Sequence, residues 1–100
     1  MIRRYRRWRW WQAVGLAQLR IMAIEHWDPL NVYDSPKDAA VYDPYLERAG
    51  RMLRRGKGSD SLARYLGNVR TKAMHLDESE TTDELFADRV VAWYSLEAPG

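Results

Sequence analysis

Residues 59–76 read SDSLARYLGNVRTKAMHL and form the clearest amphipathic pattern in the chain. At helical spacing, the apolar side chains of this stretch fall within about a third of the wheel. Ser59 or Asp60 stands where a helix N-cap is expected. The pattern therefore predicts one helix that buries a single stripe. The stripe consists of Leu62, Tyr65, Leu66, Val69, Ala73 and Leu76, and the polar side consists of Arg64, Asn68, Thr71, Lys72 and His75.

An earlier helix is expected from about Trp11 to His26. It should end where Asp28 precedes Pro29, because the residue before a proline avoids the α region. This helix is apolar on two faces, which is typical of a central helix in a bundle. One face consists of Val14, Ala17, Ile21 and Ile24, and the other of Leu16, Leu19, Ala23 and Trp27.

Two more helices are predicted by their ends. Ser35 and Pro36 indicate a short turn, after which a main helix runs from Asp43 to a terminating Gly56. Thr81 and Glu84 form a capping box for a last helix. The apolar stripe of the first of these helices is Tyr45, Leu46, Ala49, Met52 and Leu53, and that of the last is Leu85, Phe86, Val90, Trp93 and Leu96.

The fold class follows from these patterns. No segment alternates apolar and polar residues, so we expect an all-α fold, a small bundle of about four helices with no sheet. A chain of 100 residues, 46% of them hydrophobic, suits one folded domain. We expect this domain at residues 11–98, after a basic tail at residues 1–10. The predicted core includes Trp27, Leu66, Val69, Phe86 and Trp93.

Composition narrows the function classes. The chain has no cysteine, which excludes disulfides, thiol nucleophiles and cysteine-based zinc sites, and which suits a cytoplasmic location. The apolar stretch from Trp10 to Ile24 contains Arg20 and is shorter than the roughly 20 residues of a membrane span. His26 and His75 are far apart, and the acids from Asp77 to Glu84 are typical of a solvated loop. We therefore expect no cofactor, no metal, no membrane span and no enzymatic activity.

The opening of the chain is its most unusual segment. Five arginines and no acid stand in residues 1–11, interleaved with tryptophans that do not segregate from them on a helical wheel. One interpretation is an unstructured tail, or an extension upstream of the native start. The other is binding to a polyanion, because arginine contacts phosphate and tryptophan stacks on bases. The candidate residues are Arg3, Arg4, Arg6, Arg7, Arg9, Trp8 and Trp10, with Trp11 beside them. Under this interpretation residues 1–10 are dispensable for folding and supply most of the polyanion affinity.

A second basic feature lies on the helix expected from Asp43 to Gly56. Residues 43–72 hold eight basic residues against three acids, whereas residues 76–100 hold seven acids against Arg89 alone. The arginine face of this helix is either a solvated face, with a Glu47–Arg51 pair, or a surface for phosphate or an acidic protein. Its arginines are Arg48, Arg51, Arg54 and Arg55.

Short motifs near the middle of the chain give a family resemblance. Residues 26–32 read HWDPLNV, residues 41–46 read VYDPYL, and Gly58–Ser59 and residues 74–76 (MHL) follow. Over residues 18–96 this arrangement resembles the YugE-like family of small bacterial helical proteins, in which a Trp-Asp-Pro loop precedes a Tyr-Asp-x-Tyr helix start. The chain departs from the pattern at Asn31, Pro44 and His75. The resemblance implies an all-helical fold and supplies no activity or catalytic residues.

The motif residues themselves have two interpretations. In the structural one, Trp27 packs, Asp28 caps the helix or bonds the loop backbone, and Pro29 stops the helix. In the functional one, they belong to a surface for another protein, with candidates Trp27, Asp28, Tyr42, Tyr45, Arg48, Arg51 and Arg55. The sequence thus favours a small interaction module that binds another protein, with a homodimer as one form. The alternative is a nucleic-acid-binding accessory protein that uses the Arg/Trp tail and the basic helix face.

Overall fold

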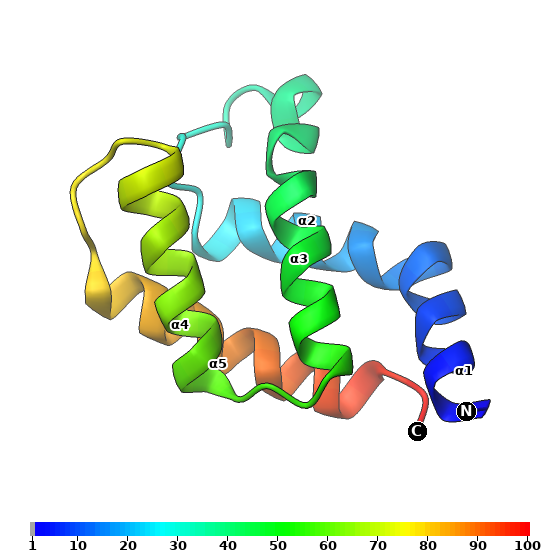
Figure 1. The fold of residues 1–100 in the computed structure, drawn as a ribbon. Helices are drawn as coiled ribbons and strands as arrows, with labels where there is room; N and C mark the ends of the chain where they lie inside the picture. The colour runs from blue at the N-terminus through cyan, green and yellow to red at the C-terminus, as the bar shows by residue number, and fades with distance from the viewer. Residues whose placement is uncertain (1) are drawn as a thin grey trace.

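The chain folds into four helical stretches, and no strand occurs in residues 2–100, which the computed structural model describes apart from the side chains of residues 2–4 and Pro36 (Figure 1). This confirms the predicted all-α class. The stretches comprise α1 (Ile2–Trp10), the π-helical η1 (Trp11–Gly15) and α2 (Leu16–His26); the 3-10 helix η2 (Pro36–Tyr42) and α3 (Asp43–Arg54); α4 (Ser59–Asn68) and the π-helical η3 (Val69–Ala73); and α5 (Glu80–Glu97).

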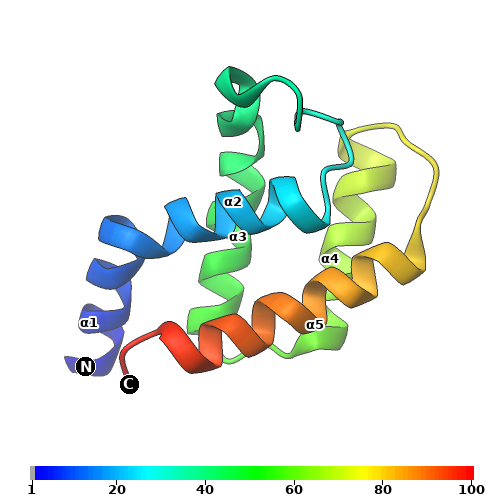
Figure 2. The ribbon, with the colours of Figure 1, turned by 180° about the vertical axis from the view of Figure 1, so that it is seen from behind.

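The helices form two layers. α3 and α4 run side by side in one layer, and α2 and α5 cross behind them in the other (Figures 1 and 2). α3 packs on α2, and α4 packs on α5. α1 continues from the start of α2 and lies beside the C-terminal end of the chain (Figures 1 and 2). Only the buried members of the predicted stripes meet between the layers, among them Leu19, Leu46, Leu66 and Phe86.

The first helix begins at Ile2, not at Trp11 as the sequence predicted. The segment expected to be a tail without ties to the core is helical because its last turn has packing partners. The Trp10 ring lies 5.5 Å from the Trp93 ring and 6.0 Å from the Tyr94 ring. This contact could not be predicted from the sequence, because arginines and tryptophans alternate in this segment and form no apolar stripe that would indicate a buried face.

The first helix also buries one apolar face rather than two. Its buried residues recur at every fourth position: Trp11, Gly15, Leu19, Ala23 and Trp27. The π-helical turn η1 adds a residue to one turn, which puts the helix out of phase with an ideal wheel. On the other face, Val14 remains 39% exposed and Ile21 56% exposed. The prediction that this helix buries both of its apolar faces is therefore wrong for the face that contains Val14 and Ile21.

Helix ends were predicted with mixed success. α3 ends as expected at Gly56, which has φ +79° and donates its N–H to the carbonyl of Leu53, while Lys57 donates to Met52. These two bonds form a Schellman motif. The N-caps were wrong by one or two residues, since Gly58 precedes α4 and Ser79 precedes α5.

Side-chain bonds explain the shifted N-caps. The Ser59 hydroxyl donates to the Asp88 carboxylate on α5 rather than capping its own helix. The Ser79 hydroxyl donates to the Thr82 hydroxyl at 2.8 Å, so α5 starts before the predicted Thr81–Glu84 box.

The core contains four of its five predicted members. Leu66, Val69 and Phe86 are buried, and the Trp27 ring stacks on the Phe86 ring at 5.5 Å with a 6° interplanar angle. Trp93 is only partly buried and donates its indole N–H to Gln18. On α5, the buried face is narrower than predicted, and Leu85 and Leu96 are exposed.

Candidate functional site

The Trp27 side chain is part of the core and not of a free surface. It is 6% exposed, and its Nε1 donates to Asp83 Oδ1 at 2.8 Å. Asp83 also accepts from Arg70, whose Nη2 lies 3.0 Å from the same oxygen. This buried ion pair joins η3 to α5 and fixes the end of α2. The sequence interpretation of Asp83 as a solvated loop acid is therefore wrong.

Asp28 and Tyr42 hold the loop between α2 and η2. Asp28 accepts the backbone N–H groups of Val32 at 2.8 Å and of Tyr33 at 3.0 Å, and the Tyr42 hydroxyl donates to it at 2.6 Å. The same hydroxyl accepts the N–H of Leu30 at 2.9 Å. Burial and the bond to Asp28 raise the pKa of the fully buried Tyr42. The Trp-Asp-Pro motif therefore has the structural role expected of it.

The remaining partner candidates lie on a groove between α3 and α4. The backbones of these helices stand apart, and the Tyr65 hydroxyl bridges them by donating to the carbonyl of Tyr45 at 2.8 Å. Two adjoining hollows, of about 380 and 480 Å³, lie along this boundary. Six cationic residues and no acid line them. The cations are Arg48, Arg51, Arg55, Lys57, Arg64 and Lys72.

The acids of α3 are engaged on its other side. Arg20 of α2 makes a bidentate pair with Asp43, with both N–O distances at 2.8 Å, and this bond raises the pKa of Arg20. Glu47 accepts the indole N–H of Trp11 at 3.0 Å. Packing of α3 on α2 thus removes both carboxylates from the groove. Among the described residues, none of the six groove cations has an acidic partner within ion-pair distance.

Two of the arginines on α3 have packing roles. The Arg48 guanidinium lies 5.6 Å from the Tyr65 ring centre. Burial of the Tyr65 hydroxyl raises its pKa. Arg54 turns away from the groove, and its guanidinium lies 5.6 Å from the Trp11 ring centre. Burial lowers the pKa of Arg54. Arg51 and Arg55 remain exposed.

The Arg/Trp opening splits into an anchored and an exposed part. Arg7 Nε donates to the Pro99 carbonyl at 3.1 Å, and Trp10 packs on α5. Trp8 is 48% exposed, and Arg6 and Arg9 are exposed with it. The side chains of Arg3 and Arg4, also predicted to bind polyanions, lie outside the described residues.

Sequence reasoning missed three cations of the groove. Lys57, Arg64 and Lys72 come from the α3–α4 turn and from the polar side of the next helix. Their signal was the excess of basic residues in residues 43–72. What the sequence lacked was the side-by-side arrangement that makes two polar helix faces line one groove.

Comparison with known proteins does not assign the chain to a family. Searches of protein families, curated proteins and solved structures find no match to this chain. Among the residues described, no group of three or more histidine and acidic side chains is arranged to hold a metal ion. No helix in that part of the chain is long and apolar enough to cross a membrane.

Proposed function

We propose that this chain is a non-enzymatic binding protein that holds the phosphate backbone of a nucleic acid in the groove between α3 and α4. The observation that carries the proposal is the set of six cations, without an acid, along two adjoining hollows. Four of the six are arginines, whose planar guanidinium groups bind phosphate oxygens in a bidentate manner. The proposal develops the predicted basic helix face into a site formed by two helices.

The groove fits a phosphate backbone better than an acidic protein. Protein interfaces depend on a few large side chains that enter apolar pockets. The large side chains Tyr45, Met52 and Tyr65 line the groove but are already partly buried against the core, and none of the large, exposed hydrophobic side chains among the described residues lines it. Affinity for a phosphate backbone, in contrast, comes mostly from charge and counterion release.

The test is a salt titration of oligonucleotide binding, followed by fluorescence anisotropy. Arg51, Arg55 and Arg64 are exposed, and none of the side-chain hydrogen bonds or ion pairs of the described residues involves them, so replacing all three with Gln should leave the fold intact. Removing one arginine–phosphate interaction lowers the log–log salt slope by about 0.7–0.9. We expect the triple variant to lose about 2–3 units of slope and to bind more weakly at each salt concentration.

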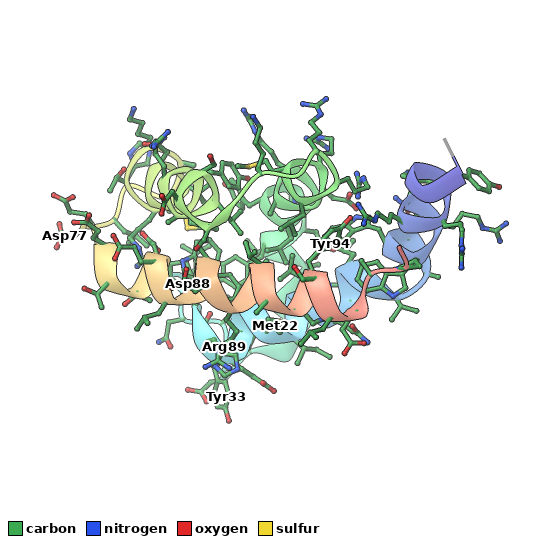
Figure 3. The ribbon with its side chains drawn as sticks, turned by 90° about the horizontal axis from the view of Figure 1, so that it is seen from below. Met22, Tyr33, Asp77, Asp88, Arg89 and Tyr94 are labelled. Carbon is green, nitrogen blue, oxygen red and sulfur yellow. The ribbon has the colours of Figure 1, made fainter. Side chains whose placement is uncertain are left out.

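The matched control is Arg89→Gln, which removes one exposed cation from the opposite side of the molecule. Arg89 points away from α3 and α4 (Figure 3). The control should bind as the unmodified chain does. Equal slopes for the triple variant and the unmodified chain would contradict the proposal. Binding of polyglutamate without binding of any oligonucleotide would also contradict it, and would favour an acidic protein partner.

A second candidate function, binding to another protein, is favoured by a different surface. Val14 and Ile21 lie two helical turns apart on the uncovered face of the first helix. A second copy of the chain would bury them. Light scattering after gel filtration tests this candidate: Ile21→Glu should convert a dimer to a monomer, and a monomeric unmodified chain would contradict the homodimer.

A further inference from the structure

We propose that the bound nucleic acid is single-stranded and that it leaves the groove over the α3–α4 turn, so that its bases reach Tyr5 and Trp8 on α1. This inference rests on the proposed function of the groove. It joins the two basic features of the sequence, the arginine face of α3 and the Arg/Trp opening, into one path.

The first observation is a continuous series of cations. A third hollow, of about 310 Å³, lies beyond the turn, between the end of α3, α5 and α1. Its two charged lining residues are the cations Lys57 and Arg7, and Tyr94 of α5 is among its uncharged ones. Lys57 also lines the groove itself. Positive charge therefore continues from α4, across the turn, to α1. Arg7 is fixed there by its bond to Pro99 and by the Tyr94 ring, 5.9 Å from its guanidinium.

The second observation is the exposed aromatic pair on α1. Tyr5 is 58% exposed and Trp8 is 48% exposed, and their rings lie 6.5 Å apart with an interplanar angle of 29°. The Arg9 guanidinium lies 5.9 Å from the Tyr5 ring centre. Aromatic rings flanked by arginines are the elements that stack on the bases of single strands. The bases of a duplex are already stacked on each other and do not reach such rings.

The third observation disfavours a path around α4. A hollow on the far side of α4 is lined by five acids and by one cation, Arg64, which also lines the groove; the acids are Asp60, Glu78, Glu80, Asp83 and Glu84. These carboxylates repel a phosphate backbone. A strand in the groove is therefore favoured to continue toward Lys57 and Arg7 and not around α4 toward the start of α5.

The experiment compares two single-stranded DNA oligonucleotides, of about 4 and about 16 nucleotides, which span the known range of site sizes. The short one should occupy only the groove. The double variant Tyr5→Ala/Trp8→Ala should bind the short oligonucleotide as the unmodified chain does, and should bind the long one at least about fivefold more weakly. The matched control is Tyr33→Ala, since Tyr33 is exposed and lies on the side away from α3 and α4 (Figure 3).

The outcomes separate this inference from the proposed function. If the Arg51/Arg55/Arg64 variant weakens both oligonucleotides and the Tyr5/Trp8 variant weakens neither, the strand stays in the groove and the path is wrong. If the groove variant changes neither, the proposed function itself fails. Equally tight binding of a duplex of the longer length, with the same loss in the Tyr5/Trp8 variant, would overturn the single-strand assignment.

A second pair of variants guards against a folding artefact in the aromatic double variant. Arg6→Gln/Arg9→Gln leaves both rings in place, and far-UV circular dichroism reports the fold of each variant. We expect this pair to lower the salt slope for the long oligonucleotide by roughly 1.5 and to leave the slope for the short one unchanged. An unchanged slope for the long oligonucleotide would overturn the path.

Discussion

Gly50 lets α3 approach the first helix closely enough to bury Trp11. A Cβ atom on Gly50 would lie 2.6 Å from Cζ2 of the Trp11 ring, and that ring is fully buried and bonded to Glu47. The ring therefore has little room to move. A glycine in a helix interior normally costs stability, and here the close approach offsets that cost.

We expect Gly50→Ala to lower the free energy of unfolding by about 1–3 kcal/mol, because overpacking outweighs the gain in helix propensity. The control is Gly67→Ala on α4, where the added Cβ would meet only Asp83 Oδ2 at 3.6 Å. That substitution should raise the free energy of unfolding by about 0.5–1 kcal/mol. Urea unfolding of both variants checks the pair, and a stabilised Gly50→Ala variant would show that Trp11 can shift.

Asp83 is the acid on which the core polar network depends. We expect Asp83→Ala to cost about 3–5 kcal/mol, because it leaves the Arg70 guanidinium and the Trp27 indole N–H buried without an acceptor. Glu84→Ala removes an exposed neighbouring acid and should change stability by less than about 0.5 kcal/mol. Similar losses in the two variants, measured by urea unfolding, would contradict the network.

Trp27 and Asp83 show which buried residues can be predicted from the sequence and which cannot. Trp27 was predicted in the core, since its spacing on the first helix is a local property of the chain. Asp83 was not, because the other acids of residues 77–84 are all exposed and its partner Arg70 is brought to it only by the folding of the chain. A buried acid among exposed acids has no local signature.

At the scale of elements, the sequence predicted where α3, α4 and α5 lie. Each has an apolar stripe that is a local property of the chain, and α3 also has a local end signal at Gly56. The helix expected over residues 59–76 is shorter, because its last turn ends at Ala73, which is exposed, and Leu76 follows outside the helix.

The buried face of the first helix was not predicted correctly, because the π-helical turn shifts the angular positions of the residues around the helix. Its start was not predicted either, because the ring that Trp10 contacts belongs to α5, far away in the sequence. The groove was half predicted, since the α3 face is visible in the sequence but the facing residues Arg64 and Lys72 acquire their role from packing.

The anchoring of α1 leads to a prediction about its tryptophans. Trp10→Ala should lower the free energy of unfolding by about 1–3 kcal/mol, because it removes contacts with the Trp93 and Tyr94 rings. Trp8→Ala, on the exposed side of the same helix, should be nearly neutral. If both variants unfold as the unmodified chain does, the opening segment is the dispensable tail that the sequence predicted.

Over the whole molecule, buried tyrosines link stability to alkaline pH. Burial raises the pKa of Tyr42, Tyr65 and Tyr94, and the bond to Asp28 raises that of Tyr42 further. The folded chain therefore keeps phenol protons at a pH where the unfolded chain releases them. This contribution to stability is complete below about pH 10, the ordinary tyrosine value, and is lost as the pH rises above it.

Tyr42→Phe separates the contribution of one phenol. We expect the unmodified chain to lose stability above about pH 10 more steeply than the variant, by about 1.4 kcal/mol per pH unit. The variant should be less stable at neutral pH, because Asp28 and the Leu30 N–H lose a partner. Urea unfolding across the alkaline range measures both effects, and parallel pH profiles would contradict this role for Tyr42.

The two-layer arrangement also segregates charge over the molecule. α4 separates the basic groove from the acidic hollow at the start of α5, so one side attracts a phosphate backbone and the other repels it. Net charge is only +2, which conceals this polarity. The proposed function therefore specifies a location, because we propose that a nucleic acid binds along α3, the α3–α4 turn and the facing side of α4.

Backbone amide NMR shifts during titration with a single-stranded oligonucleotide test this location most directly. We expect shift changes concentrated on residues 48–72, with further changes on α1 for a long oligonucleotide, and little change around Ile21 or Leu85. Changes centred on the exposed sides of α2 and α5, or no changes at low salt, would contradict it.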